Sequence, residues 1–205
     1  LGKQFTDTQW ERICGLTKTV SSNARFKLVH FNFLHCTYLT PVVIQRFDKN
    51  RKSECPRCKR EGATFLHLAW ECAEIAEFWE RVTALITNAT GRLCPAEPGV
   101  CLLGGIGPPI RKGRKAGYKF TQLALLLARR RVAITWMGQE SPKVERWLSD
   151  VAEWSLAEMI RLKKCRTGEK LEEDLDQWSL LLAQLSPDGE EVYDGEVSNT
   201  EEEEG

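Results

Sequence analysis

Apolar residues recur at helical spacing along most of the chain. After Cys72, the positions Ile75, Trp79, Val82 and Ile86 follow one another at intervals of 4, 3 and 4 residues, which places them on one face of an amphipathic helix. No stretch shows the alternation of apolar and polar residues that marks a half-buried strand. The pattern therefore predicts an all-α fold.

Helical periodicity extends to segments on both sides of this one. Further helices are expected in residues 25–36, 40–47, 118–136, 141–162 and 171–185. In the second of them, Thr40 is expected to cap the helix and Pro41 to occupy its first position, where proline's missing N–H is no loss. In the third, the residues up to Leu127 are apolar on most sides, which predicts that this helix is buried.

Gly and Pro residues interrupt the helical pattern in residues 91–117, which read GRLCPAEPGVCLLGGIGPPIRKGRKAG. This segment is interpreted as a basic linker, broken by a short apolar patch at residues 100–103. It divides the chain into a helical region, residues 1–90, and a helical C-terminal segment, residues 118–186. Residues 187–205 are rich in Asp and Glu and are expected to form a disordered tail.

Charge is distributed unevenly along the chain. The whole sequence balances 29 Lys and Arg against 29 Asp and Glu, but residues 188–205 contain nine acidic residues and no basic one. Residues 1–187 therefore carry a net charge of +9. A basic body is typical of proteins that bind nucleic acid, although a solvated surface is the common alternative. A further hypothesis is that the acidic tail covers this surface and competes with nucleic acid.

Three cysteines and a histidine form a motif that predicts a metal site. The motif reads Cys55-x2-Cys58-x8-His67-x4-Cys72, and such a set of thiolates and one imidazole suits a single Zn²⁺ in a tetrahedral, structural site. His67 and Cys72 are five residues apart, about 140° around an α-helix, so one straight helix cannot direct both at an ion. We therefore expect His67 in a turn or a distorted first turn, and Cys72 near the start of a helix.

Two alternatives to a zinc site remain open from the sequence. The four residues could be buried without a metal, or Cys55 and Cys58 could form a redox pair, although the βαβ pattern of thioredoxin-like proteins is absent. The other cysteines show no pairing pattern, and no signal peptide or membrane span is apparent, so an intracellular protein of the cytoplasm, the nucleus or both is expected. The first residue is Leu1, which suggests a piece of a longer product or a trimmed one.

Several segments, taken in order, resemble one known protein family. They are FKLVHFNFLHCTYLTP, the metal motif with LHLAWEC, EIAEFWERV, CLLG, ARRRVAITWMGQESPKVERWL and DQWSLLLAQL. They cover about residues 10–185 and resemble the zinc-binding region after the reverse transcriptase domain in LINE-type (non-LTR) retrotransposon polyproteins. The resemblance implies that Cys55, Cys58, His67 and Cys72 bind the zinc, and that the reverse transcriptase core of a parent polyprotein is a partner.

In that family this region is thought to hold template RNA or target DNA. The resemblance thus implies a non-catalytic module that binds nucleic acid, and the sequence contains no polymerase or endonuclease motif. The candidate contacts are basic: Arg51, Lys52, Arg57, Lys59, Arg60, Arg111, Lys112, Arg114, Lys115, Lys119, Arg129 and Arg130. Phe31, Phe33 and Tyr38 are candidates for stacking on bases, although aromatic residues at helical spacing more often belong to a core.

The alternative function is a zinc-stabilised helical scaffold that docks onto other proteins and binds no nucleic acid. Trp136, Trp147, Trp154 and Trp178 favour it, as does the zero net charge of the whole chain. No set of nucleophile, base and oxyanion donors suggests an enzyme, and neither a membrane nor a small-molecule substrate is expected. The two hypotheses differ in the salt dependence of RNA binding, because phosphate contacts weaken steeply as salt rises.

Overall fold

The computed structural model describes residues 5–105, 115–165 and 169–185. Its helices are α1 (Asp7–Thr19), α2 (Ala24–Leu34), α3 (Pro41–Phe47), the π-helical turn η1 (His67–Glu71), α4 (Ala73–Thr90), α5 (Pro98–Cys101), α6 (Lys115–Ile134), α7 (Val144–Cys165) and α8 (Glu169–Leu185). No strand occurs in these ranges, which confirms the predicted all-α fold. The predicted contacts Arg111, Lys112 and Arg114 and the acidic tail lie outside the described residues, as does the side chain of Lys115.

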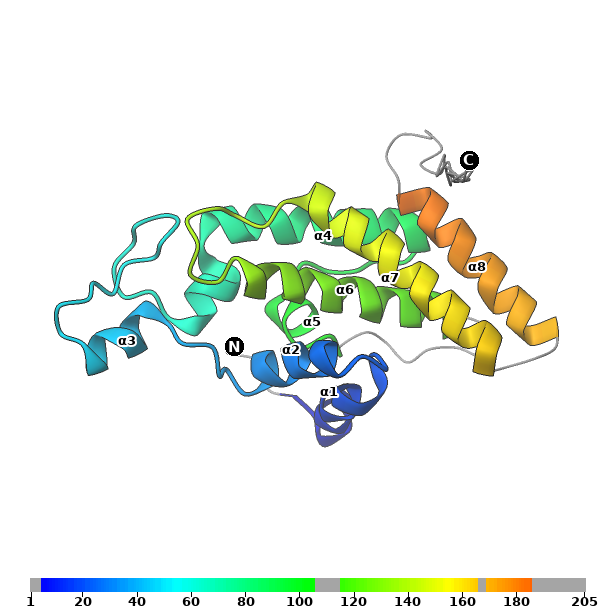
Figure 1. Cartoon of the computed structure of the whole chain (residues 1–205), viewed down its shortest axis with the longest axis horizontal. Coiled ribbons are helices and arrows are strands. Elements are labelled where there is room, and N and C mark those ends of the chain that lie inside the picture. Colours follow the sequence, from blue (N-terminus) through cyan, green and yellow to red (C-terminus); the bar gives the residue numbers. More distant parts are fainter. Residues whose placement is uncertain (1–4, 106–114, 166–168, 186–205) are drawn as a thin grey trace, which may run out of the picture.

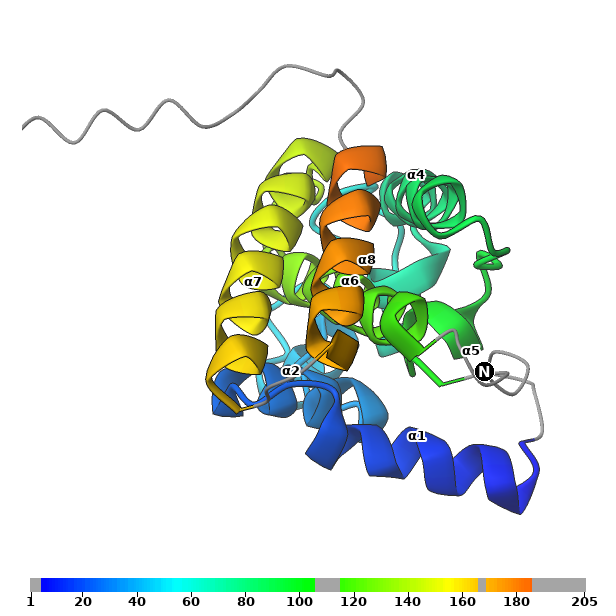
Figure 2. The same ribbon diagram turned by 90° about the vertical axis from the view of Figure 1, so that its right-hand side faces the viewer.

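Helix α6 is the central helix of the molecule. It packs against α2, α4, α7 and α8, while α1 packs on α2. The two views show α4, α6, α7 and α8 gathered into one bundle, with α1 and α2 along its lower side (Figure 1 and Figure 2). Helix α3 and the loop that follows it project beyond the bundle at one end (Figure 1). None of the described helices is long and apolar enough to cross a membrane.

Tryptophan side chains join the neighbouring helices to α6 by hydrogen bonding and packing. The indole N–H of Trp147 in α7 donates to the backbone oxygen of Ala124 at 2.9 Å, and Trp178 of α8 packs edge-on against Phe120 with ring centroids 5.6 Å apart. Both indoles are almost wholly enclosed, and so is Trp136. Three of the four tryptophans that favoured a docking scaffold therefore stabilise the core and offer no exposed surface to a partner.

One hydrophobic core includes residues from both sides of the predicted linker. Buried residues of α4, which precedes the linker, belong to the same cluster as those of α6, which follows it. Leu102 and Leu103 of the linker are also buried in this cluster, next to the short helix α5. The helical regions before and after the linker thus pack against each other, and the apolar patch between them takes part in that packing.

Arg129 is enclosed in the core although the sequence predicts it at a nucleic-acid surface. Its side chain is 0% exposed, and its Nη1 donates to the backbone oxygen of Cys101 at 3.4 Å. Gly104 leaves room for the guanidinium, because a Cβ at this position would lie only 2.6 Å from Nη1 of Arg129. Its φ of +70° is a second reason for glycine, since other residues rarely adopt it. The prediction that Arg129 contacts nucleic acid is therefore wrong, since protein surrounds its charge on all sides.

The next two arginines of α6 are directed at α7. Arg130 and Arg131 both pair with the buried carboxylate of Asp150, and the distance from Arg130 Nη1 to Asp150 Oδ2 is 2.9 Å. The guanidinium of Arg130 also lies over the ring of Phe26, 5.8 Å from its centroid. Arg130 remains 31% exposed, and the single carboxylate of Asp150 is shared by two guanidiniums, so one net positive charge remains here and the predicted nucleic-acid contact of Arg130 stays a prediction.

A buried histidine joins α1 to α2. His30 is 0% exposed, and its Nε2 donates to the backbone oxygen of Ile13 at 3.1 Å. Burial and the positive charge of Arg129 lower the pKa of His30 to about 4, against the opposing effect of the hydrogen bond to Ile13. The ring is therefore neutral in the folded chain at neutral pH. His30 is thus packed in the fold and is not one of the residues of the metal motif.

Replacing His30 by glutamine should make the fold less sensitive to acid. The unfolded chain binds a proton at this histidine near pH 6.5, but the folded chain binds it only near pH 4. The free energy of unfolding therefore falls as the pH drops from about 6.5 to 4, and His30→Gln removes this contribution while keeping a donor for Ile13. Denaturant titrations at several pH values should show a shallower decline for the variant. Parallel curves for the two proteins would contradict this account.

Candidate metal centre

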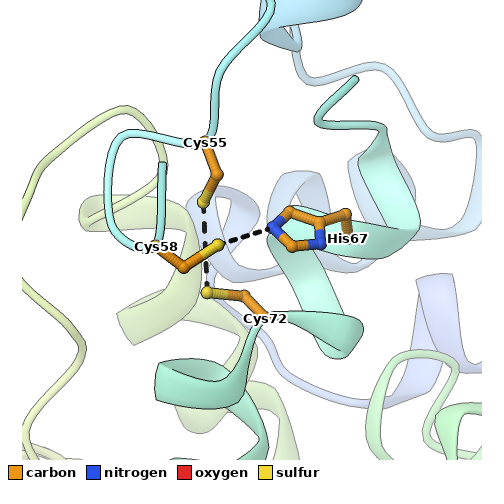
Figure 3. A group of neighbouring side chains, drawn as sticks. All are labelled: Cys55, Cys58, His67 and Cys72. Carbon is orange, nitrogen blue, oxygen red and sulfur yellow. Dashed lines mark hydrogen bonds between the residues drawn. The ribbon is translucent and has the colours of Figure 1, made fainter. Parts of the chain in front are cut away.

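The side chains of Cys55, Cys58, His67 and Cys72 meet at one point, between the loop after α3 and the start of α4 (Figure 3). Their ligand atoms all lie within 4.8 Å of one another. The Sγ atoms of Cys55 and Cys72 are 3.9 Å apart, and Cys58 Sγ is 3.3 Å from His67 Nε2. Three of the four residues are buried, and Cys58 is exposed. The group is close enough to hold one metal ion, as the sequence predicts.

Backbone hydrogen bonds shape the loop that carries Cys55 and Cys58. The N–H of Cys55 donates to the oxygen of Arg60 at 2.8 Å, and the N–H of Lys59 donates back to the oxygen of Cys55 at 3.0 Å. Lys59 and Gly62 have φ values of +63° and +69°, which turn the chain sharply after the second cysteine. The tight turn brings both sulfur atoms to the same side of the loop (Figure 3).

A π-helical turn brings the side chains of His67 and Cys72 to the same side of the chain. The N–H of Cys72 donates to the oxygen of His67 at 3.0 Å, a bond between residues five apart that is the defining bond of a π-helix. One wide turn therefore places both side chains over the same side, where one α-helical turn would separate them. Cys72 then takes an extended conformation and occupies the N-cap position of α4, which leaves its sulfur free of a capping bond. The prediction of a distorted turn followed by a helix start is confirmed.

The wide turn leaves backbone oxygens that need donors from elsewhere. The indole N–H of Trp79, which is 0% exposed, donates to the oxygen of Ala69 at 2.9 Å. The oxygen of Leu68 accepts a longer bond, 3.5 Å, from Nη1 of Arg57. A buried carbonyl without a donor costs about 1–3 kcal/mol, so these two side chains stabilise the turn that aligns the ligands. The helical spacing of Trp79 predicts a core position but gives no sign of this hydrogen bond.

Arg57 connects the metal loop to the end of α6. Its Nη2 donates to the backbone oxygen of Thr135 at 2.7 Å, and its Nε donates to the oxygen of Glu140 at 3.4 Å. Burial lowers the pKa of Arg57, while the nearby cysteines act in the opposite direction. The sequence predicts Arg57 as a nucleic-acid contact, but its donors are engaged with three backbone oxygens of the chain itself. Its positive charge also faces the thiols that a metal would convert to thiolates.

The ligand side chains differ in how readily they lose a proton. Burial, followed by the charge of Cys55, raises the pKa of Cys72 to about 11. At Cys58 burial acts in the same direction, but hydrogen bonds, first that of the Arg60 backbone, outweigh it and lower the pKa. Burial and the charge of Arg60 lower the pKa of His67, which keeps its imidazole neutral and able to bind a cation. Metal binding must therefore displace at least the proton of Cys72.

The remaining basic candidates are divided between two places. Arg51, Lys52, Lys59 and Arg60 are exposed around the metal loop. Lys119 is exposed near the start of α6, whereas Arg57 contacts the other end of that helix. Among the aromatic candidates, Phe33 is 1% exposed and belongs to the core, Tyr38 is half-buried and Phe31 is exposed. The structure thus gathers four of the predicted basic contacts at the metal loop and leaves Lys119 apart from them.

Replacing Cys72 by serine should abolish stoichiometric metal binding. The wild-type chain is expected to hold one ion, because four ligand atoms converge, and serine at position 72 removes one of the enclosed ligands. Cys36→Ser is the matched control, since Cys36 is an exposed thiol outside the cluster. Elemental analysis of purified protein should give one metal per chain for wild type and control, and much less for Cys72→Ser. Equal metal content in all three proteins would refute the site.

Replacing Trp79 by phenylalanine should weaken the turn without removing a ligand. The variant keeps an aromatic ring in the core but leaves the oxygen of Ala69 without its donor, so the free energy of unfolding should fall by about 1–3 kcal/mol. Metal affinity should fall with it, because the π-helical turn aligns His67 with Cys72. Trp70→Phe is the control, since the neighbouring Trp70 is only partly buried. Equal losses in the two variants, measured by denaturation and competitive metal titration, would argue against the hydrogen bond.

The geometry of the centre is that of three thiols and one imidazole around a point that one ion can fill. A tetrahedral ion held by these four residues has no further position for water or substrate. The resemblance to the LINE-type reverse transcriptase region rests on sequence segments alone and stays a prediction. No model of a known protein family matches this chain.

Proposed function

We propose that the chain is a non-catalytic module that binds one Zn²⁺ through Cys55, Cys58, His67 and Cys72, and nucleic acid through the basic surface beside that ion. In this proposal the chain derives from the zinc-binding region of a LINE-type retrotransposon reverse transcriptase, with template RNA or target DNA as its ligand. The reverse transcriptase core of the parent polyprotein is its proposed protein partner.

The choice of zinc is supported by the ligand types and their separations. Zinc in proteins favours tetrahedral sets of cysteine sulfur and histidine nitrogen, with Zn–S bonds of about 2.3 Å and Zn–N bonds of about 2.0–2.1 Å. Such bonds at tetrahedral angles separate two sulfurs by about 3.8 Å, and a sulfur from a nitrogen by about 3.6 Å. The observed distances are close to these values: 3.9 Å between the Sγ atoms of Cys55 and Cys72, and 3.3 Å between Cys58 Sγ and His67 Nε2.

The observation that carries the nucleic-acid proposal is the cluster of exposed cations on the part of the molecule that projects from the bundle. We call residues 41–66, which comprise α3 and the loop with Cys55 and Cys58, the metal lobe (Figure 1). Its exposed basic residues, the lobe cations, are Arg46, Lys49, Arg51, Lys52, Lys59 and Arg60. The lobe also contains Arg57 and the acidic residues Asp48, Glu54 and Glu61, which leaves a net charge of +4.

A bound zinc ion and its thiolates would change the net charge of the metal lobe only slightly. Three thiolates and one Zn²⁺ together contribute one negative charge, so the loaded lobe and its centre remain basic. Two lobe cations have acidic neighbours, since Arg51 lies 3.7 Å from Asp48 and Lys52 lies 3.1 Å from Glu54. Both pairs are largely exposed, and exposed pairs of this kind are worth at most about 1 kcal/mol. A phosphate can therefore replace either carboxylate at little cost.

A protein-docking scaffold is the second candidate, and one observation favours it. Leu28 and Phe31 on α2 are 57% and 43% exposed, which gives that helix an apolar outer face. The tryptophans that first suggested a scaffold are mostly buried in the core. The charged surface of the metal lobe is therefore the stronger indication, and binding measurements separate the two candidates.

Neutralising four lobe cations should weaken RNA binding and make it less sensitive to salt. The variant carries Arg51→Gln, Lys52→Gln, Lys59→Gln and Arg60→Gln. Each lost phosphate contact on a single strand reduces the slope of log affinity against log salt by about 0.7, so four reduce it by up to about 3. The affinity of the zinc-loaded chain for labelled single-stranded RNA should fall about 10-fold or more at low salt.

The control variant removes four exposed positive charges elsewhere, at Lys18, Arg25, Lys163 and Lys164. Its net charge equals that of the lobe variant, so a general loss of attraction would affect both equally. Fluorescence anisotropy at two or more salt concentrations should show a near-normal affinity and salt slope for the control. Absence of RNA and DNA binding by the wild-type chain at low salt would reject the nucleic-acid function in favour of the scaffold.

A further inference from the structure

Phe47, the last residue of α3, is exposed to an extent that the fold does not explain. Its side chain is 82% exposed, more than any other large apolar side chain in the described part of the chain. No ring contact with a described aromatic residue involves it, and Pro41 is the one residue of α3 that is fully buried. Burying a phenylalanine stabilises a protein by about 1.5–3 kcal/mol, and this position forgoes that gain.

The residues next to Phe47 indicate what it can bind. Arg46 precedes it, Lys49 follows two residues later, and Arg51 and Lys52 lie in the loop beyond, all of them exposed. A single aromatic ring among cations offers too little apolar area for a protein interface or for a stable membrane anchor. A base of a single strand presents an apolar π-face next to an anionic backbone, which is the complementary combination.

The turn after α3 holds the ring and the cations in a defined arrangement. Thr40 caps the helix by accepting a hydrogen bond from the N–H of Val43 at 3.3 Å. After the helix, Asp48 accepts from the backbone N–H groups of Asn50, at 3.0 Å through its side chain, and of Arg51, at 3.1 Å through its main chain. These bonds fix the backbone from Asp48 to Arg51, directly after Phe47, without requiring the side chains of Phe47 and Arg51 to be buried.

The base of the lobe is also anchored to the bundle. The indole N–H of Trp136, just after α6, donates to the backbone oxygen of Leu39 at 2.6 Å. The N–H of Ala63 donates to the oxygen of Ser53 at 2.8 Å and closes the loop that begins beyond Lys52. The lobe is therefore bonded to the bundle where it begins, and the loop that the Ala63–Ser53 bond closes carries the metal ligands Cys55 and Cys58.

We propose that the ring of Phe47 stacks on a base of single-stranded nucleic acid whose phosphates contact the lobe cations around it. This inference rests on the proposed nucleic-acid function and adds to it the residue that reads the base face. Stacking of this kind is worth about 1–3 kcal/mol for each base and tolerates any sequence. The site should therefore prefer unpaired strands over duplexes, in which neighbouring bases cover each face.

The test compares the zinc-loaded wild-type chain with Phe47→Ala on two labelled probes. One is an oligouridylate of about twelve nucleotides, and the other is an abasic sugar-phosphate strand of the same length. Phe47→Ala should weaken binding of the oligouridylate by about 5- to 160-fold and leave its salt slope unchanged, because no cation is removed. Binding of the abasic strand should be the same for both proteins, and Phe47→Trp should bind the oligouridylate at least as tightly as wild type.

Trp10→Ala is the matched control, because Trp10 is also an exposed aromatic residue and lies on α1, outside the metal lobe. It should retain wild-type affinity. If wild type binds the oligouridylate and Phe47→Ala binds it equally well, stacking by Phe47 is overturned while the nucleic-acid function stands. If wild type binds neither strand, stacking by Phe47 is overturned, and the nucleic-acid function fails with it when duplex RNA and DNA are not bound at low salt either. Metal content and the unfolding midpoint should be unchanged in every variant, since both rings are exposed.

Discussion

Two side chains five residues apart diverge by about 140° around a straight α-helix, and this constraint at His67 and Cys72 determines much of the structure around the metal centre. The chain meets it with a π-helical turn, whose defining hydrogen bond joins those same two residues. The turn leaves backbone oxygens that an α-helix would have satisfied. Trp79 from α4 and Arg57 from the metal lobe supply the missing donors. The turn that aligns His67 with Cys72 is therefore hydrogen-bonded to α4 through Trp79, and through Arg57 it is connected to the end of α6.

Helix α6, against which α2, α4, α7 and α8 pack, also encloses a charged side chain. Its middle residues are apolar on nearly every side, yet Arg129 is enclosed among them with one backbone acceptor, the oxygen of Cys101. Burial lowers the pKa of Arg129 to about 10, which still leaves it charged at neutral pH. A charge held in this way costs free energy that the surrounding packing must offset. The close approach of Gly104 shows how tightly the chain is folded around that guanidinium.

Much of this arrangement could be predicted because its signals are local. Helical spacing identified α4, the cap and proline identified the start of α3, and the spacing of His67 and Cys72 predicted a distorted turn. The roles of Arg129, Arg130 and Arg131 could not be predicted in the same way. Adjacent cations on a buried-looking helix look alike in a sequence, and only the positions of Gly104 and Asp150 in three dimensions decide which is enclosed.

The side chains that hold the metal turn escaped prediction for a related reason. Trp79 lies at a regular position of the apolar stripe of α4, so its spacing gives no sign that its indole N–H also donates to the backbone oxygen of Ala69. Arg57 sits among other cations, and its acceptors at Thr135 and Glu140 are about 80 residues further along the chain. Long-range partners of this kind depend on the assembled fold and leave no trace in local composition.

The uneven enclosure of the four ligands bears on how long an ion would stay bound. Cys55, His67 and Cys72 are buried, and Cys58 alone faces solvent. A competing chelator, a softer metal or an oxidant would therefore meet the sulfur of Cys58 first, and exchange would begin by opening that bond. The rate at which the ion leaves would then depend first on the loop that carries Cys58, although all four ligands contribute to the affinity.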